Sequence, residues 1–192
     1  KGSVNLKGAR IDDITLKNYK ENLEKDSPLV NLLSPNGSDK SYFANFGWLS
    51  LDQKLIVPDG TTNWKTDDQK LVVGKPTTLY WDNSQGVRFE IVLNIDKNYM
   101  FDITQRVINN TNNTYDFAPF AVMNRLNDDT KSSPVVHEGP IAVLDGGLEE
   151  EKFSDLKDKG KISCSALWIC YCLTNGIAGR GLKWILRFFS SK

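Results

Sequence analysis

Apolar and polar side chains alternate most regularly along residues 87–96. From Val87 to Ile95 every second residue is apolar, and most of the residues between them are polar or charged. A period of two predicts a β-strand with one buried face. A polar turn follows, and the alternation resumes in residues 99–108. The two runs predict an antiparallel β-hairpin, and the apolar face of its second strand carries Tyr99, Phe101, Ile103 and Val107.

Shorter apolar runs elsewhere predict further strands. Glycine, proline, asparagine and aspartate separate these runs, and such residues favour turns through their backbone conformations and local hydrogen bonds. The predicted strands cover residues 9–16, 29–33, 42–49, 77–81, 118–124 and 141–144. Because strands and helices do not alternate along the chain, the pattern argues against a doubly wound α/β sheet. It predicts a mainly β fold, an antiparallel β-sandwich, with one short helix near residues 149–157.

Residues 161–192 follow a different pattern. Apolar residues recur at helical spacing between Leu182 and Phe189, which predicts a helix over residues 180–189. On such a helix Arg180, Lys183 and Arg187 gather on the side opposite the apolar residues, and Trp184 lies on the flank. We therefore expect Arg180, Lys183, Trp184 and Arg187 to contact a membrane interface. Docking of this helix on the body of the protein is the alternative interpretation.

Charge divides the chain at the same place. The 192 residues contain 24 basic and 24 acidic residues, so the formal net charge is zero. Residues 161–192 hold five of the basic residues and none of the acidic ones, which leaves 19 basic against 24 acidic residues in the first 160. All three cysteines also lie in the tail. We therefore predict an acidic domain of residues 1–160 and a basic, apolar tail of residues 161–192, with no overall charge that favours nucleic acid.

Few side chains suggest catalysis or metal binding. His137 is the only histidine and precedes Glu138; such a pair can supply a general acid and base, but neighbours on a strand point to opposite faces. A structural role for His137 is therefore favoured. Cys164, Cys170 and Cys172 lack the spacing of a zinc site and have no histidine nearby. The sequence thus predicts no catalytic residue, no metal and no cofactor.

Aromatic and acidic residues give two further expectations. A group of aromatic residues would either line a groove for sugars or apolar chains or fill the core, and the core is favoured; the group is Trp48, Trp64, Tyr80, Trp81, Tyr99 and Phe101. Adjacent aspartates occur at residues 12–13, 67–68 and 128–129. Such pairs are expected in solvated loops or as caps of turns.

Seven blocks of sequence resemble one protein family in the family's own order. Typical blocks read Tyr-Phe-Ala-Asn-Phe-Gly-Trp at residues 42–48 and His-Glu-Gly-Pro-Ile-Ala-Val-Leu-Asp-Gly at residues 137–146. The others lie at residues 7–19, 32–35, 79–83 with 86–89, 98–101 and 105–110. Together they resemble the large periplasmic domain of the bacterial YidC membrane-protein insertases, across roughly residues 4–160.

The resemblance implies a fold and a role. The fold is a β-supersandwich similar to the galactose-mutarotase-like domains, and it lies between the first and second transmembrane helices of a multi-pass protein, on the periplasmic face of the inner membrane. The family implies no enzyme activity. Its proposed partners are components of the Sec translocon and nascent membrane-protein clients, bound in a groove or at sheet edges.

The resemblance ends near Lys161, where the charge and the use of cysteine also change. One hypothesis is a foreign tail, translated in another reading frame, that leaves the sandwich short of its last strands. The other is a divergent native tail with its amphipathic helix at the membrane. For the chain as a whole we predict a non-catalytic insertase domain that binds proteins. The alternative is a carbohydrate-binding or mutarotase-like domain that uses His137 and Glu138.

Overall fold

The structure is a computed structural model that describes residues 1–51, 53–125, 141–144, 147–150, 170–172 and 182–186. The chain forms two compact units, and each is described by itself. The first unit comprises Lys1–Asn127 and Ile169–Lys192, and the second comprises Asp128–Trp168. Within the described residues no helix meets the length and apolarity that a bilayer crossing requires.

The first sheet of the larger unit runs in the order β1-β2-β4-β9-β12, and β3 also pairs with β2. All of its strand pairs are antiparallel. Its strands are β1 (Gly2–Asn5), β2 (Arg10–Lys20), β3 (Leu29–Leu33), β4 (Tyr42–Ser50), β9 (Tyr115–Arg125) and β12 (Cys170–Cys172).

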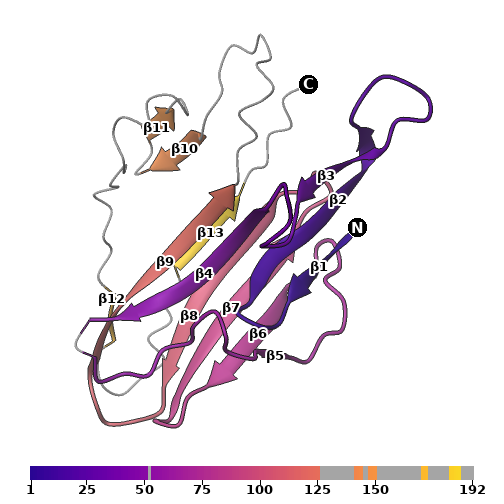
Figure 1. The fold of residues 1–192 in the computed structure, drawn as a ribbon. Coiled ribbons are helices and arrows are strands. Elements are labelled where there is room, and N and C mark those ends of the chain that lie inside the picture. Colours follow the sequence, from indigo (N-terminus) through magenta and orange to yellow (C-terminus); the bar gives the residue numbers. More distant parts are fainter. Residues whose placement is uncertain (52, 126–140, 145–146, 151–169, 173–181, 187–192) are drawn as a thin grey trace. The chain divides into compact units, whose positions relative to one another are not determined.

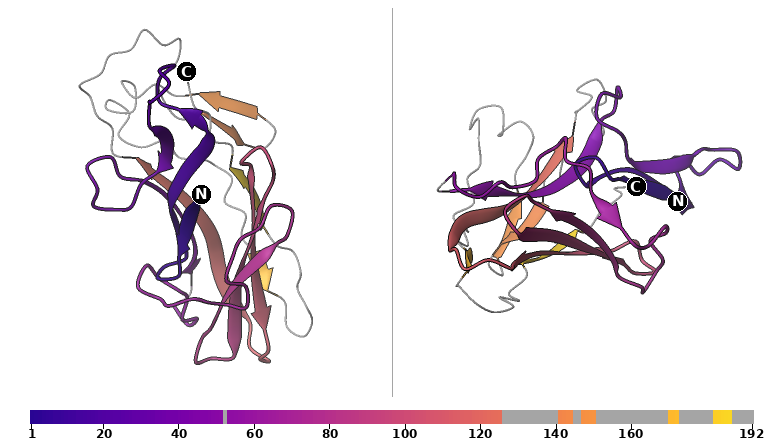
Figure 2. Two further views of the ribbon diagram at one scale, coloured as in Figure 1. Left: turned by 90° about the vertical axis from the view of Figure 1, so that its right-hand side faces the viewer. Right: turned by 90° about the horizontal axis from the view of Figure 1, so that it is seen from below.

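The second sheet runs in the order β13-β8-β7-β6-β5, again with antiparallel pairs. Its strands are β5 (Lys65–Thr66), β6 (Thr77–Asp82), β7 (Val87–Ile95), β8 (Phe101–Asn109) and β13 (Leu182–Leu186). Figures 1 and 2 show the two sheets as two facing layers. The mainly β fold and the antiparallel sandwich predicted from the sequence are therefore confirmed.

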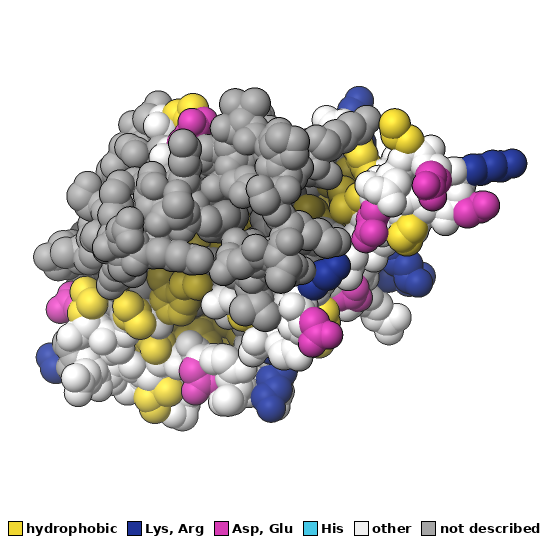
Figure 3. Space-filling model, turned by 45° about the horizontal axis from the view of Figure 1, so that its top comes forward, with side chains coloured by type: hydrophobic (Ala, Val, Ile, Leu, Met, Phe, Trp, Pro, Cys, Tyr) yellow, Lys and Arg dark blue, Asp and Glu magenta, His cyan; other side chains and the backbone are white. Residues whose placement is uncertain are grey.

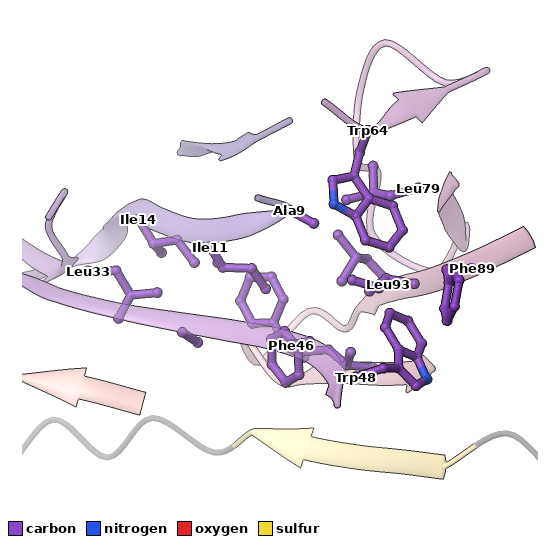
Figure 4. Close-up of a cluster of buried hydrophobic side chains, with 14 of the residues drawn as sticks. Ala9, Ile11, Ile14, Leu33, Phe46, Trp48, Trp64, Leu79, Phe89 and Leu93 are labelled. Carbon is purple, nitrogen blue, oxygen red and sulfur yellow. The ribbon is translucent and has the colours of Figure 1, made fainter. Parts of the chain in front are cut away.

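Large apolar side chains from both sheets fill the space between them. Ile11 and Leu33 come from the first sheet and Phe89 and Ile91 from the second, and each is at most 1% exposed. Figure 4 shows this cluster, with Trp48 and Trp64 at one end of it. One polar side chain also enters the core: Gln105 of β8 is 2% exposed, and its Nε2 donates to the Gly47 carbonyl oxygen of β4 at 2.8 Å. This bond joins the two sheets and satisfies polar groups that burial would otherwise leave unpaired.

The β7–β8 hairpin has the form that the alternation predicts. In β7 every second residue from Val87 to Leu93 is buried, and β8 buries Phe101 and Ile103 on the same side. Asp96 closes the turn, because its Oδ1 accepts the N–H groups of Asn98 and Met100, each at 2.8 Å.

The β6–β7 turn lies at the other end of β7 and holds a neighbouring loop. Asn83 donates through Nδ2 to the Ile56 carbonyl oxygen at 2.8 Å, and Gln85 accepts the Ile56 N–H at 2.6 Å and donates to the Lys54 carbonyl oxygen at 2.6 Å. Between these bonds Leu55 is buried in the core. Two amide side chains therefore tie residues 54–56 to the second sheet.

The pairing of β2 with its neighbours β1 and β3 is irregular at three places. In its pairing with β1, Val4 lies opposite Ile11 and Ser3 opposite Asp13, so Asp12 is an extra residue in β2. Such a β-bulge shifts the phase of the strand, and accordingly Ile11 and Ile14 both face the core. The pairing with β3 shifts register between Ile14 and Thr15 and again between Thr15 and Lys20.

The second unit contains a hairpin in its described part. The strands β10 (Ile141–Leu144) and β11 (Gly147–Glu150) pair antiparallel. The helix predicted near residues 149–157 is wrong for residues 149 and 150, which belong to β11. Residues 151–157 lie outside the described residues.

The helix predicted over residues 180–189 is wrong for its described part. Residues 182–186 form β13, which pairs with β8, with Trp184 opposite Ile103 and Lys183 opposite Thr104. A short apolar run fits a strand as well as a helix, and pairing along β8 satisfies the backbone groups of this run. The grouping of basic residues on one side depends on a helical period of 3.6, which a strand does not have.

Candidate functional site

The residues first considered for catalysis fall outside the described part of the chain. This holds for both His137 and Glu138, so their suggested roles stay predictions. Arg180 and Arg187 also lie outside the described residues, while Lys183 and Trp184 belong to β13. Contact of these four residues with a membrane stays a prediction, without support from the strand that residues 182–186 form.

Metal-ligating side chains do not gather in the described residues. Among them no group of three or more histidine, cysteine, aspartate or glutamate side chains lies close enough to hold a metal ion. Cys170 and Cys172 lie in β12 opposite Phe117 and Tyr115, and Cys164 lies outside the described part.

Most of the aromatic residues considered for a groove form the core instead. Trp48, Trp64 and Phe101 are each 3–4% exposed. The two tryptophan rings stack with centroids 6.2 Å apart, and Trp48 meets Phe89 edge-on at 5.1 Å. For these residues the favoured interpretation as core is confirmed. Tyr80, Trp81 and Tyr99 are half-buried.

The outer face of the second sheet carries paired polar groups. Residues directly opposite one another in a sheet share a face, and the register places Lys65, Tyr80, Glu90 and Arg106 in one row across β5, β6, β7 and β8. In this row Arg106 Nε lies 3.6 Å from Glu90 Oε2. The face is therefore mixed in charge, and its Arg106 and Glu90 side chains form an ion pair.

The strongest ion pair of this face is Arg88 with Asp82. The guanidinium donates twice, from Nε to Oδ1 at 2.6 Å and from one Nη to Oδ2 at 2.9 Å, and its Cζ lies 4.6 Å from the centre of the Tyr80 ring. Hydrogen bonding to Arg88 lowers the pKa of Asp82 below its ordinary value, and the same bond raises the pKa of Arg88. Both partners are satisfied by one another, which makes them poor candidates for chemistry on a substrate.

The outer face of the first sheet combines a buried charge with an aromatic ring. Asp12, at the β2 bulge, is 6% exposed, and its Oδ2 lies 3.3 Å from Nε of Arg10, whose Cζ lies 5.4 Å from the centre of the Phe43 ring. The expectation that the aspartate pair at residues 12–13 lies in a loop or caps a turn is therefore wrong. Asp12 is instead the extra residue of a bulge within β2, and Arg10 offsets its charge.

An exposed apolar strip runs beside this charge pair. Ala44, Phe46 and Trp48 of β4 face the core, so Leu49 faces outward with the β9 residues of the same face, Phe120 and Val122. Leu49 is 56% and Val122 48% exposed, and Phe120 is half-buried. We call Leu49, Phe120 and Val122 the outer strip. Large apolar groups that remain exposed side by side suit contact with another macromolecule.

Gly47 lets the outer strip lie close to the sheet. It pairs with Phe120, and a Cβ at residue 47 would lie 2.6 Å from Cζ of the Phe120 ring. The ring thus covers the backbone where β4 has no side chain. Neither the strip nor the bulge gives a motif that could be found from the sequence, because both depend on which strands become neighbours.

The β2–β3 arm, residues 17–29, is the most exposed part of the first sheet. All its residues except Ser27 are exposed, and Leu23 is 102% exposed at the tip. Figure 1 shows the arm projecting past the neighbouring strands. In Figure 3 basic, acidic and apolar side chains are interspersed along it.

Comparison with known proteins identifies the family. The family model described as the YidC periplasmic domain matches residues 1–171. The chain belongs to this family. The match reaches past residue 161, where the resemblance found in the sequence had ended, and includes part of β12. The division of the chain at residue 160 stays a prediction.

Three relatives illustrate the similarity. The chain is 38% identical over 166 residues to the "Membrane protein insertase YidC" of Rickettsia bellii, with 86% of this chain covered. It is 38% identical over 159 residues to the proteins of the same name from Rickettsia prowazekii and Rickettsia akari, with 82% of this chain covered. The chain spans only 30% of the first relative and 28% of the other two.

Proposed function

We propose that this YidC periplasmic domain serves a membrane-protein insertase by binding proteins and not by catalysis. The observation that carries the proposal is the family match over residues 1–171, together with relatives that are named insertases. In this proposal the domain lies on the periplasmic face of the bacterial inner membrane. It connects the first and second transmembrane helices of a multi-pass protein and assists the insertion and folding of inner-membrane proteins.

The proposed partners are nascent membrane-protein clients and components of the Sec translocon. Clients expose apolar segments, and an exposed apolar surface is the feature of the domain that suits them. The outer strip meets this requirement: Leu49 and Val122 are about half exposed and Phe120 lies between them. The outer face of the second sheet does not, because its charged groups pair with each other. The outer strip is therefore our candidate for the binding surface.

Photo-crosslinking in the full-length insertase tests this function. A crosslinking amino acid replaces Leu49 or Val122 in turn, and Arg106, exposed on the outer face of the second sheet, is the matched control position. We expect crosslinks to a client under insertion, or to a Sec component, from the two positions of the outer strip and not from residue 106. Equal crosslinking at all three positions, or none at residues 49 and 122, would contradict the proposed surface.

A functional readout accompanies the crosslinks. Leu49→Asp and Val122→Asp place charges on the outer strip without touching the core. Val73→Asp is the matched control, because Val73 is also apolar and is 56% exposed outside the outer strip. We expect slower insertion of a client into membranes for the first two variants only. An unchanged insertion rate in the double variant Leu49→Asp/Val122→Asp would show that the outer strip has no part in the function.

A further inference from the structure

The β2–β3 arm exposes an apolar tip on an ordered loop. Leu23 is 102% exposed, while Tyr19 and Leu29 at the two sides of the arm are 44% and 41% exposed. The loop is closed by hydrogen bonds from Glu21 N–H to the Pro28 carbonyl oxygen at 2.9 Å and from Asn22 N–H to Ser27 Oγ at 2.8 Å. An exposed leucine on a loop that is fixed in this way is available for contact at little cost in conformational entropy.

Two local backbone distortions hold the arm against the second sheet. Tyr19 lies in the stretch of β2, between Thr15 and Lys20, over which the register with β3 shifts, and its ring meets the ring of Tyr99 edge-on with centroids 6.2 Å apart. Tyr99 lies in the β7–β8 turn with φ of 63°, a left-handed conformation that is unfavourable for a bulky residue. Strain of this kind persists where the surrounding structure requires a particular side-chain position. Here the required position is the contact that fixes the base of the arm.

The amino terminus of the domain lies beside the arm. The Thr15 N–H donates to the Lys1 carbonyl oxygen at 2.7 Å, and the amino group of Lys1 donates to the Thr15 carbonyl oxygen at 2.8 Å. The β2 strand runs toward the arm, and β1 is antiparallel to it, so β1 runs away from the arm. A segment that continued β1 backward in a straight line would therefore extend toward the tip of the arm. In the proposed function the segment that leads into β1 is the one that anchors the domain in the membrane.

From these observations we propose that the β2–β3 arm faces the lipid bilayer and that Leu23 enters its headgroup region. The proposal rests on the proposed function, which places the anchor before residue 1. Leucine and tyrosine suit the boundary between headgroups and acyl chains, and the Lys25 side chain can extend its charge toward water. The ammonium of Lys20 instead donates to the Lys25 carbonyl oxygen and so helps to close the loop. The arm holds three basic residues, at positions 17, 20 and 25, and three acidic residues, at positions 21, 24 and 26. Its net charge of zero means that the contact needs no anionic lipid and withstands salt.

The first test attaches the full chain by its amino terminus to vesicles. An amino-terminal histidine tag binds a nickel-chelating lipid in phosphatidylcholine vesicles, and an environment-sensitive dye labels a single cysteine at Leu23→Cys after Cys164, Cys170 and Cys172 are changed to serine. Ile56→Cys is the matched control, because Ile56 is 51% exposed and is held by the β6–β7 turn, at the opposite end of β7 from Tyr99. We expect a blue shift and quenching by spin-labelled lipid at residue 23, with neither at residue 56, and the same result at high salt.

Equal, water-like emission at residues 23 and 56 would overturn the proposal. A second outcome is a blue shift at residue 23 in the absence of vesicles, when unlabelled chain or another protein is added. This outcome would also overturn the proposal and would indicate a protein partner. Both outcomes leave the crosslinks from Leu49 and Val122 unaffected. Failure of the arm to meet lipid is therefore distinguishable from failure of the proposed function.

A second measurement needs no label and therefore leaves the native cysteines in place. Trypsin cleaves after lysine, and Lys20 and Lys25 flank the exposed tip. We expect tethering to vesicles to protect these two sites in the native chain, and Leu23→Asp to abolish the protection while leaving the cleavage rate in solution unchanged. Protection that persists in Leu23→Asp, or no protection in the native chain, would contradict insertion of the tip.

Discussion

The two sheets differ in how closely their strands keep to the two-residue period. β7 alternates from Val87 to Leu93, and its outer charged groups pair with neighbours on β6 and β8. In the first sheet β2 is bulged at Asp12, its pairing with β3 shifts register again, β4 contains Gly47 beneath Phe120, and apolar residues stay exposed. Departures from local consistency tend to occur where a protein binds or acts. In the function that we propose, the first sheet is the side that binds and the second sheet supports it.

The largest expected effect concerns the core face of the second sheet. Phe89 is fully buried and contacts the rings of Trp48 and Trp81, so Phe89→Ala leaves a cavity between the sheets. We expect a loss of about 3–5 kcal/mol in the free energy of unfolding, measured by urea denaturation. Val92→Ala on the half-buried outer face of the same strand is the control. A similar loss in both variants would show that β7 does not have one core face and one outer face.

The next effect tests the irregular sheet. Gly47→Ala brings a Cβ to 2.6 Å from the Phe120 ring, so the ring must move or the strands must separate. We expect the free energy of unfolding to fall by about 1–3 kcal/mol, as in other overpacked sites. Adding Phe120→Ala removes the obstacle, so the double variant should lose less than the sum of the two single variants. Additive losses would mean that the close approach of Phe120 does not determine the need for glycine.

The same contrast explains which features could be predicted from the sequence. Strands with clear alternation or strong apolar runs were found, and residues 29–33 and 141–144 agree with β3 and β10 in both bounds. The largest error at a strand end is four residues, because β2 continues to Lys20 and not only to residue 16. The two-residue strand β5 and the short strands β1 and β11 have no periodic signal of their own, because pairing with a neighbour creates them. Residues 182–186 fit either period, and only β8 decides between strand and helix.

Candidate surfaces are harder to predict than strands. The sequence favoured the core for Trp48 and Trp64, but the stacking of their rings follows from the packing of the two sheets. The outer strip joins β4 to β9, which lie far apart in the sequence. The contact of Tyr19 with Tyr99 joins a register shift to a left-handed turn residue. No pattern along one strand contains such information.

A smaller effect measures the contact between the arm and the regular sheet. Tyr19→Ala and Tyr99→Ala, singly and together, form a double-mutant cycle on a pair of rings that meet edge-on. We expect a coupling free energy of about 0.5–1.5 kcal/mol and faster trypsin cleavage at the arm in both single variants. Tyr80→Ala, on the outer face of the second sheet, provides the comparison for loss of a tyrosine away from the arm. A coupling of zero would mean that the two distortions are not connected through their side chains.

The smallest expected effect is the change of the free energy of unfolding with pH that comes from the Asp82–Arg88 pair of the second sheet. Hydrogen bonding to Arg88 lowers the pKa of Asp82 in the folded protein from the ordinary value of 3.8. A carboxyl group whose folded pKa is lowered adds stability above its unfolded pKa, and this stability is lost as the pH falls through the folded pKa. Both side chains are partly exposed, at 39% and 48%, so solvent screening limits the contribution to less than about 1 kcal/mol. We expect Asp82→Asn to lower the free energy of unfolding at neutral pH and to converge with the native chain in strong acid. Hydrogen bonds with Thr61 and Thr62 also lower the pKa of Asp59. Because Asp59 is present in both the native chain and Asp82→Asn, the difference between their free energies of unfolding reports on Asp82. A difference that stays constant across the acid range would show that the charge of Asp82 does not stabilise the outer face of the second sheet.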